Sequence, residues 1–185
     1  MDFIKPETYL IGLIGLLLII AVLVGRQLLR VRSDEIKLVE LEKSGAPTSK
    51  NASELYELAS VQLRKRLYPQ AITTLKKALK ALEGEPEEAK ALIENALGFA
   101  LAAQDNFEAA ITHYRTAIKA KGNYPVALNN LAYAQAKMKD SEEALRLYKQ
   151  VLTLDPGNKT ASKQIKRIET NNQNTLPNTD DSRGF

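Results

Sequence analysis

Residues Pro125 to Pro156 read "PVALNNLAYAQAKMKDSEEALRLYKQVLTLDP", and the small and large apolar residues of this stretch recur 34 positions earlier and again near residue 55. A unit of about 34 residues that folds as helix, turn and helix cannot bury its apolar face alone, so it needs stacked neighbours. The stretch therefore predicts an all-α solenoid with an inner groove. A groove of this kind binds partners and carries out no chemistry.

The repeats align on one small residue at which the two helices of each unit approach closely, namely Ala71, Ala110 and Ala144. This alignment predicts three tetratricopeptide repeats (TPRs), at residues 52–85, 91–124 and 125–158. Other equivalent positions are also small or apolar: Leu58, Leu97 and Leu131; Ala59, Gly98 and Ala132; Leu75, Tyr114 and Tyr148. Three unrelated amphipathic hairpins would share the helical spacing but not the 34-residue period, so repeats are favoured.

Repeat 2 departs from the pattern of the other two. Five extra residues separate it from repeat 1, and Pro86, Glu87 and Glu88 among them suit the first turn of a helix. We therefore expect the first helix of repeat 2 to begin early. The first large position of this repeat carries Glu94, where Trp is frequent in the TPR pattern.

The segment after the third repeat has the composition of a solenoid end. Residues 159–169 place Ala161, Ile165 and Ile168 on one side of a helix, and the other side carries three cations: Lys163, Lys166 and Arg167. A terminal helix needs one apolar and one charged face to shield the last repeat from water, so we expect a capping helix here. Residues 170–185 have little apolar content and are expected to be disordered.

Residues 1–32 are predicted to be a transmembrane anchor with a basic flank. Residues 8–25 are 18 consecutive residues without a charge, and a helix of that length covers nearly all of a hydrocarbon core about 30 Å thick. A cleaved signal peptide is the alternative, but its apolar region is normally about 7 to 15 residues and follows a basic segment. Here Arg26 follows the apolar run directly, which favours an uncleaved, single-pass span.

The distribution of cations indicates the orientation of this span, because Lys and Arg near the ends of a span stay on the cytoplasmic side. Lys5 precedes the span. Four cations follow it closely: Arg26, Arg30, Arg32 and Lys37. We therefore expect the repeats in the cytosol, or in the stroma if the membrane is a plastid thylakoid.

Residues 33–51 are expected to form a juxtamembrane helix and a linker. The part up to Lys43 is amphipathic, with Ser33 as a plausible N-cap and acids in the first turn. This helix either continues the span as a stalk or lies on the membrane surface. Gly45 and Pro47 then end it.

Composition excludes several functions. The chain of 185 residues has no Cys and one His, so it lacks a cysteine nucleophile and a zinc-thiolate site, and we expect no metal, no cofactor and no enzyme activity. His113 is expected to be a structural or solvated residue. Residues 52–169 carry 18 Lys and Arg against 14 Asp and Glu, a mild and dispersed excess that makes nucleic-acid binding unlikely.

Function is therefore expected on the inner face, lined by the first helix of each repeat at its second, fifth, ninth and twelfth positions. Within this set, Asn95 and Asn129 are equivalent, and so are Phe99 and Tyr133. Amides can hydrogen-bond an extended backbone, and aromatic rings beside alanines leave pockets for apolar side chains. The alternative is that the asparagines are solvent-facing polar residues and the rings pack on neighbouring helices. The predicted protein-binding groove comprises Tyr56, Ser60, Leu63, Asn95, Phe99, Ala102, Asn129, Tyr133 and Ala136.

The groove lacks the cations of TPR domains that grip the acidic tail of heat-shock proteins. Those domains use Lys and Asn on the first helix of repeat 1, where this chain has Tyr56 and Ser60, and only Lys137 remains of the cationic set. A neutral, partly apolar protein partner fits better than an acidic tail.

The whole arrangement resembles a known family. An N-terminal span, basic residues, three TPRs with an insertion after the first, and motifs such as "ALIENALGFALAAQDNFEAAITHYRTAIKA" and "YPVALNNLAYA" resemble the membrane-anchored photosystem I assembly factors of cyanobacteria and chloroplasts, catalogued as hypothetical chloroplast reading frame thirty-seven. This resemblance implies a thylakoid-bound scaffold or chaperone whose clients are photosystem I subunits or an assembly intermediate.

We therefore expect a membrane-tethered TPR adaptor that binds a protein client in its groove, with no small-molecule substrate. A structural or adaptor subunit of another membrane complex, such as a pilus or a secretion apparatus, is the alternative.

Overall fold

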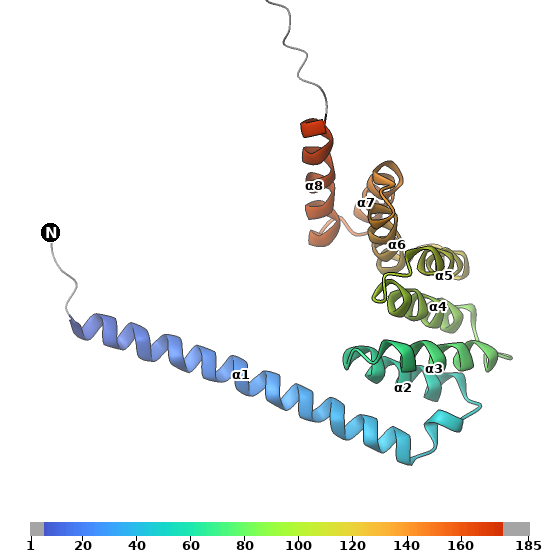
Figure 1. Cartoon of the computed structure of the whole chain (residues 1–185), viewed down its shortest axis with the longest axis horizontal. Coiled ribbons are helices and arrows are strands. Elements are labelled where there is room, and N and C mark those ends of the chain that lie inside the picture. Colours follow the sequence, from blue (N-terminus) through green and yellow to red (C-terminus); the bar gives the residue numbers. More distant parts are fainter. Residues whose placement is uncertain (1–5, 176–185) are drawn as a thin grey trace, which may run out of the picture. The chain divides into compact units, whose positions relative to one another are not determined.

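A computed structural model of the protein describes residues 6–175. Within that range the chain forms α-helices and one short 3₁₀ helix and contains no strand, as the sequence predicted. The helices divide between two compact units, residues 1–46 and 47–185. Figure 1 shows the first unit as one long helix and the second as a stack of helices.

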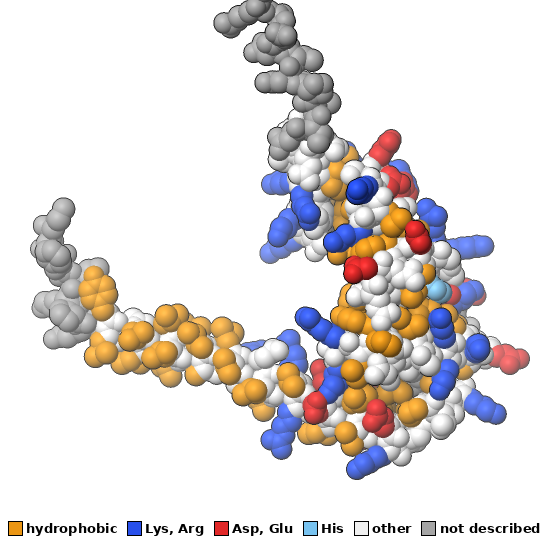
Figure 2. Space-filling model, viewed as in Figure 1, with side chains coloured by type: hydrophobic (Ala, Val, Ile, Leu, Met, Phe, Trp, Pro, Cys, Tyr) orange, Lys and Arg blue, Asp and Glu red, His pale blue; other side chains and the backbone are white. Residues whose placement is uncertain are grey.

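The first unit is the helix α1, Pro6–Lys43. Within the described residues, Tyr9–Lys43 is the stretch that is long and apolar enough to cross a membrane, with a mean hydropathy of 2.4 in its most apolar window. None of that window is buried by the rest of the protein, and Figure 2 shows hydrophobic side chains along the helix. A span of this composition satisfies its backbone hydrogen bonds internally, which is what hydrocarbon requires.

The separate helix expected to start at Ser33 is not formed, because Ser33 lies inside α1. No Gly or Pro occurs between Arg26 and Lys43, and Leu, Arg, Glu and Lys all favour helix, so nothing interrupts the backbone. The structure has one continuous helix over this segment, and its position relative to a membrane stays a prediction. The helix ends before Gly45, which has a positive φ of 85°.

The second unit contains three helix pairs and one final helix. The pairs are α2 (Ala52–Arg64) with α3 (Tyr68–Lys80), α4 (Glu87–Ala102) with α5 (Phe107–Ala120), and α6 (Pro125–Lys137) with α7 (Ser141–Leu154). The final helix is α8 (Lys159–Thr175). The first and third pairs fall within predicted repeats 1 and 3, whereas the second pair begins at Glu87, four residues before predicted repeat 2. Successive helices pack on one another along the stack (Figure 1).

Side-chain caps and tight turns set the helix boundaries. Asn51 Oδ1 accepts hydrogen bonds from the backbone N of Ser53 and Glu54, at 2.8 and 3.2 Å, and thereby satisfies free donors at the start of α2. The turn inside each repeat uses a residue with a left-handed backbone at the same repeat position: Arg66, Asp105 and Lys139, with φ of 59°, 59° and 65°.

Small residues allow the two helices of each repeat to touch. Ala71, Ala110 and Ala144 are fully buried, as the alignment requires. At Gly98 the approach is closer still, because an added Cβ would lie 2.7 Å from Cε1 of the buried Tyr114 ring. The buried side chains of α2 to α8 form a continuous core, so the repeats stabilise one another.

The insertion between repeats 1 and 2 lengthens α4 at its start, as expected. This helix begins at Glu87 and has 16 residues, whereas α2 and α6 have 13 each. Pro86 is its N-cap, with the extended backbone of ψ 152° that precedes a helix.

The final helix begins where the capping helix was predicted but is longer. It extends to Thr175, six residues past Glu169, so the expectation of disorder is wrong for residues 170–175. The reason is that no Gly or Pro occurs between Gly157 and Pro177. In addition, Thr170 Oγ1 donates a hydrogen bond to the carbonyl of Lys166 at 2.9 Å within the helix. The rest of the predicted tail, residues 176–185, lies outside the described residues.

Candidate functional site

The first helices of repeats 2 and 3 carry large apolar side chains on the solvent side. Leu92, Phe99, Val126 and Tyr133 are 40 to 54% exposed, and all four occupy positions expected to line the groove. Figure 2 shows hydrophobic side chains grouped over α4 between charged ones. Apolar surface grouped in this way is typical of a binding site.

One pocket of about 350 Å³ lies among these side chains. Four of the nine predicted groove residues line it, namely Phe99, Ala102, Asn129 and Tyr133. Its remaining lining residues come from α4 to α8: Ala103, Tyr114, Asn130, Tyr148, Thr160 and Gln164. We call this the aromatic pocket. Its volume suits one apolar side chain of a partner together with the adjacent backbone.

Asn129 provides the polar feature of the aromatic pocket. Its Oδ1 atom is buried and has no hydrogen-bond partner in the protein. A buried amide oxygen without a donor costs free energy, so most native structures avoid one. The atom is therefore an acceptor that the described part of the protein leaves unused.

Contacts on two sides hold Tyr133 in place. The ring of Phe107 meets it edge to face, with centroids 6.3 Å apart and an interplanar angle of 67°. The ammonium group of Lys137 lies 5.5 Å from its centroid, within the range of a cation–π contact. A ring fixed in this way loses little conformational entropy when a partner binds.

Two buried tyrosines complete the wall of the aromatic pocket. Tyr114 and Tyr148 are each 1% exposed. Burial raises the pKa of Tyr148 to about 12, with Tyr133 adding to the shift and Arg167 opposing it. Burial likewise raises the pKa of the Tyr114 phenol well above its usual range. Both phenols are therefore neutral at physiological pH, and the wall carries no charge.

Asn95, equivalent to Asn129 one repeat earlier, has a different environment. Its Oδ1 accepts a hydrogen bond of 3.0 Å from Nδ2 of Asn130, which joins α4 to α6. Burial raises the pKa of the neighbouring Tyr124 phenol, Tyr56 adds to this shift, and a side-chain hydrogen bond with Asn95 lowers the pKa. The two asparagines thus do not form a ladder of free amides, because one of them connects the repeats.

The remaining predicted residues do not line the aromatic pocket. Ala136 lines an adjacent hollow of about 140 Å³ that shares Tyr133 and includes Lys137 and Arg167. Tyr56 borders a separate hollow of about 150 Å³ near the start of the solenoid. Ser60 donates from Oγ to the carbonyl of Tyr56 at 2.8 Å. Leu63 packs against the hydrophobic core.

Sequence reasoning missed the contribution of α8. Thr160 and Gln164 of this helix line the aromatic pocket, although the segment was predicted only to cap the solenoid. A signal was present, because Thr160 occupies the second position of what would be a fourth 34-residue unit beginning at Lys159. The final helix thus acts both as a cap and as one side of the groove.

His113 lies away from the aromatic pocket and is a structural residue, as expected. Its Nδ1 is 2.6 Å from Oε2 of Glu94, which is 8% exposed. The contact joins α4 to α5 at the position where Trp is frequent in the TPR pattern. Among the described residues, no group of three His, Cys, Asp or Glu side chains could hold a metal ion.

Fold and groove together define a TPR protein, a class that mediates protein–protein interactions and is typically non-enzymatic. Tetratricopeptide repeat family models match residues 125–158 and residues 95–124. The first match has the bounds of the predicted third repeat.

The chain belongs to the ycf37 family. It is 31% identical over 163 residues to the uncharacterized protein ycf37 of Pyropia yezoensis, covering 86% of this chain and 92% of the relative. The ycf37 protein of Guillardia theta is 29% identical, with 89% and 93% covered. The chloroplastic TPR domain-containing protein PYG7 of Arabidopsis thaliana is 34% identical over 83% of this chain, which spans 51% of that longer protein.

Solved structures support the fold. The Cut9–Hcn1 tetramer of the APC/C matches with a TM-score of 0.70 at 22% identity, over 78% of this chain and 28% of that one. The first TPR of Spaghetti (RPAP3), solved with an HSP90 peptide, matches with a TM-score of 0.62 at 22% identity, over 68% and 95%. At these identities the likeness concerns the fold alone.

Proposed function

We propose that this protein is a membrane-tethered TPR scaffold that holds protein clients in its concave groove and assists the assembly or stability of photosystem I at the thylakoid membrane. The observation that carries the proposal is the aromatic pocket with the unpaired Oδ1 of Asn129. A partner segment that inserts an apolar side chain beside Phe99 and Tyr133 would place a backbone N–H near that oxygen.

The long helix α1 supports the tether. Its apolar window matches the thickness of a hydrocarbon core, and four cations follow it: Arg26, Arg30, Arg32 and Lys37. By the positive-inside rule these cations favour a location of the solenoid in the cytosol or stroma. A tether confines the groove and a membrane-bound client to one surface, so a modest affinity suffices and the client can still be released.

Family membership supports the photosystem role. The chloroplastic name of the Arabidopsis relative agrees with a plastid setting, and the motifs of the three repeats resemble those of photosystem I assembly factors. The uncharged wall of the aromatic pocket suits an apolar segment of a membrane protein better than a strongly charged tail.

Site-specific photo-crosslinking tests the proposal. A photoreactive phenylalanine analogue at Phe99, in the full-length protein in thylakoid membranes, should form adducts with photosystem I subunits or an assembly intermediate. The same analogue at Thr112, exposed on α5, is the matched control and should not. Adducts confined to another membrane complex would refute the photosystem role, and equal adducts at both positions would refute the groove.

A further inference from the structure

The solvent-exposed stripe of α3 differs in charge from those of the equivalent helices α5 and α7. It carries Lys76, Lys77 and Lys80, and α3 contains no acidic residue. In α5 two cations accompany one acid, and in α7 two cations accompany two acids. There, Arg146 is also bound to Glu143 at 2.6 Å. Repeat 1 therefore has an uncompensated positive face that the other two repeats lack.

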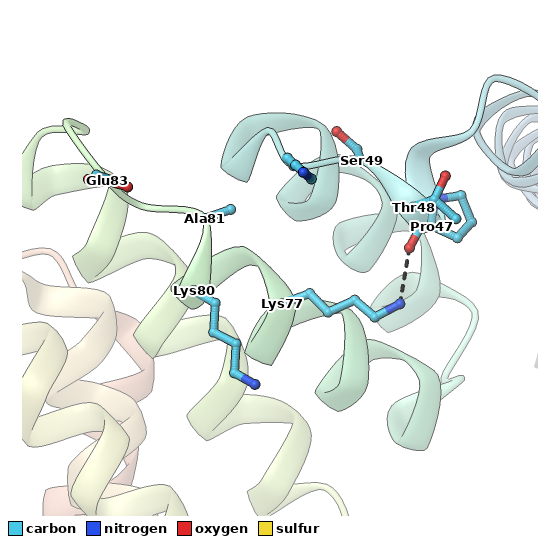
Figure 3. A pocket seen from close by; sticks show the side chains of 8 residues that line it. Pro47, Thr48, Ser49, Lys77, Lys80, Ala81 and Glu83 are labelled. Carbon is cyan, nitrogen blue, oxygen red and sulfur yellow. Dashed lines mark hydrogen bonds between the residues drawn. The ribbon is translucent and has the colours of Figure 1, made fainter.

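The end of this stripe borders a pocket of about 700 Å³ (Figure 3). Lys50, Lys77 and Lys80 line it together with Ser49, and Glu83 is its one acidic residue. Lys77 Nζ donates to the carbonyl of Pro47 at 3.0 Å, which leaves its ammonium group two further donors. Figure 3 shows Lys77 reaching the linker while Lys80 extends away from the helix. Three ammonium groups and a hydroxyl around one hollow suit a phosphate or sulfonate group.

The position of the pocket along the chain indicates which anion it meets. Pro47 is four residues beyond Lys43, the last residue of α1. The bond from Lys77 fastens this linker beside the lysines, so the chain from the apolar helix enters the solenoid at its positive face. Residues Ala46–Thr48 of this linker form the 3₁₀ helix, so only Ser44 and Gly45 lie between α1 and that helix.

We propose that the positive face of repeat 1, formed by Lys50, Lys77 and Lys80 at this pocket and by Lys76 on the exposed stripe of α3, binds anionic lipid headgroups of the membrane that holds α1. The inference rests on the proposed anchor. Each cation close to an anionic surface raises the bound-to-unbound ratio about fivefold, so loss of two lowers it about 30-fold. Binding here would leave the aromatic pocket, on other helices, free for a client.

Energy transfer in proteoliposomes tests this inference with the full chain. Because the chain has no cysteine, Thr73→Cys places a single dye on the exposed stripe of α3, and acceptors label the headgroups. Thr112→Cys is the matched probe at the same repeat position of α5. Transfer from position 73 should be stronger in phosphatidylcholine with phosphatidylglycerol than in phosphatidylcholine alone, and should fall between about 0.05 and 0.5 M salt.

Charge variants complete the test. Lys76→Gln with Lys80→Gln should lower the bound-to-unbound ratio about 30-fold, whereas Arg115→Gln with Lys119→Gln, at the same two positions of repeat 2, should leave it unchanged. Equal transfer in both lipids, or equal loss in both double variants, would overturn the proposal. So would lost client capture with unchanged lipid transfer, since the lysines would then serve an acidic protein. Flotation after carbonate washing reports on the anchor separately.

Discussion

Replacement of Asn129 by Leu tests whether this residue serves partner binding or the stability of the fold. Leu has the same branched shape and the same number of side-chain heavy atoms but no polar atom, so Asn129→Leu removes the buried oxygen that lacks a partner in the free protein. Such a group costs about 1–3 kcal/mol. Because the Asn129 side chain as a whole is only half-buried, we expect a gain in the free energy of unfolding near the lower limit, about 1 kcal/mol. For a domain of this size, that raises Tm by about 4 °C.

The same substitution should weaken the client complex. Loss of one hydrogen bond between neutral groups costs about 1 kcal/mol, or about fivefold in Kd. Tm is measured by circular dichroism of the full chain in detergent, and Kd by titration with the client segment identified through crosslinking at Phe99. A gain in stability together with a loss of affinity is the signature of an oxygen reserved for a partner.

The neighbouring Asn130 provides the control. Its Nδ2 donates to Asn95 Oδ1 at 3.0 Å, so Asn130→Leu removes a bond that is already formed and should lower the free energy of unfolding by about 1 kcal/mol. If Asn129→Leu also lowered Tm, or left Kd unchanged, the reasoning about the unpaired oxygen would be refuted.

Three further predictions follow from the fold. Gly98→Ala should lower the free energy of unfolding by about 1–3 kcal/mol in a denaturant titration, because the new methyl group would overlap the Tyr114 ring; unchanged stability would show that the ring can move. Burial raises the pKa of Tyr148 from 10.0 to about 12. The contribution of Tyr148 to the free energy of unfolding should therefore be intact below pH 10 and should be lost as the pH rises from 10 to 12. Tyr148→Phe should flatten that alkaline decline in Tm, and an identical decline would assign it to other groups. A chain lacking residues 1–43 should leave carbonate-washed vesicles, whereas retention would place the membrane attachment elsewhere.

The 34-residue period accounts for what the sequence could predict. It gave the phase of the repeats, and with it the positions of Phe99, Asn129 and Tyr133, three residues that line one pocket. These positions follow from periodicity because equivalent residues of a solenoid face the same way. The early start of α4 followed from local signals at Pro86 and the acids after it.

Other features depend on the stacking of neighbouring repeats and were not predictable. Asn95 bonds Asn130 and not its equivalent, Asn129, because the partner is chosen by the offset between two helices. Gln164 enters the aromatic pocket only because α8 packs against α7 in the orientation of a further repeat. The length of α8 was underestimated because polar residues such as Asn171 and Asn172 have modest helix propensity. The helix nevertheless continues, because no Gly or Pro occurs between Gly157 and Pro177.

The turn residues Arg66 and Lys139 are positions at which a substitution should raise the stability of the protein. A left-handed backbone costs an ordinary residue about 1–2 kcal/mol more than glycine, and neither side chain offers the local hydrogen bonds that ease this conformation in Asp or Asn. Glycine at both turns, neither of which lines the aromatic pocket, would yield a more stable molecule with its groove intact. Such a molecule is a practical starting material for capturing a client complex.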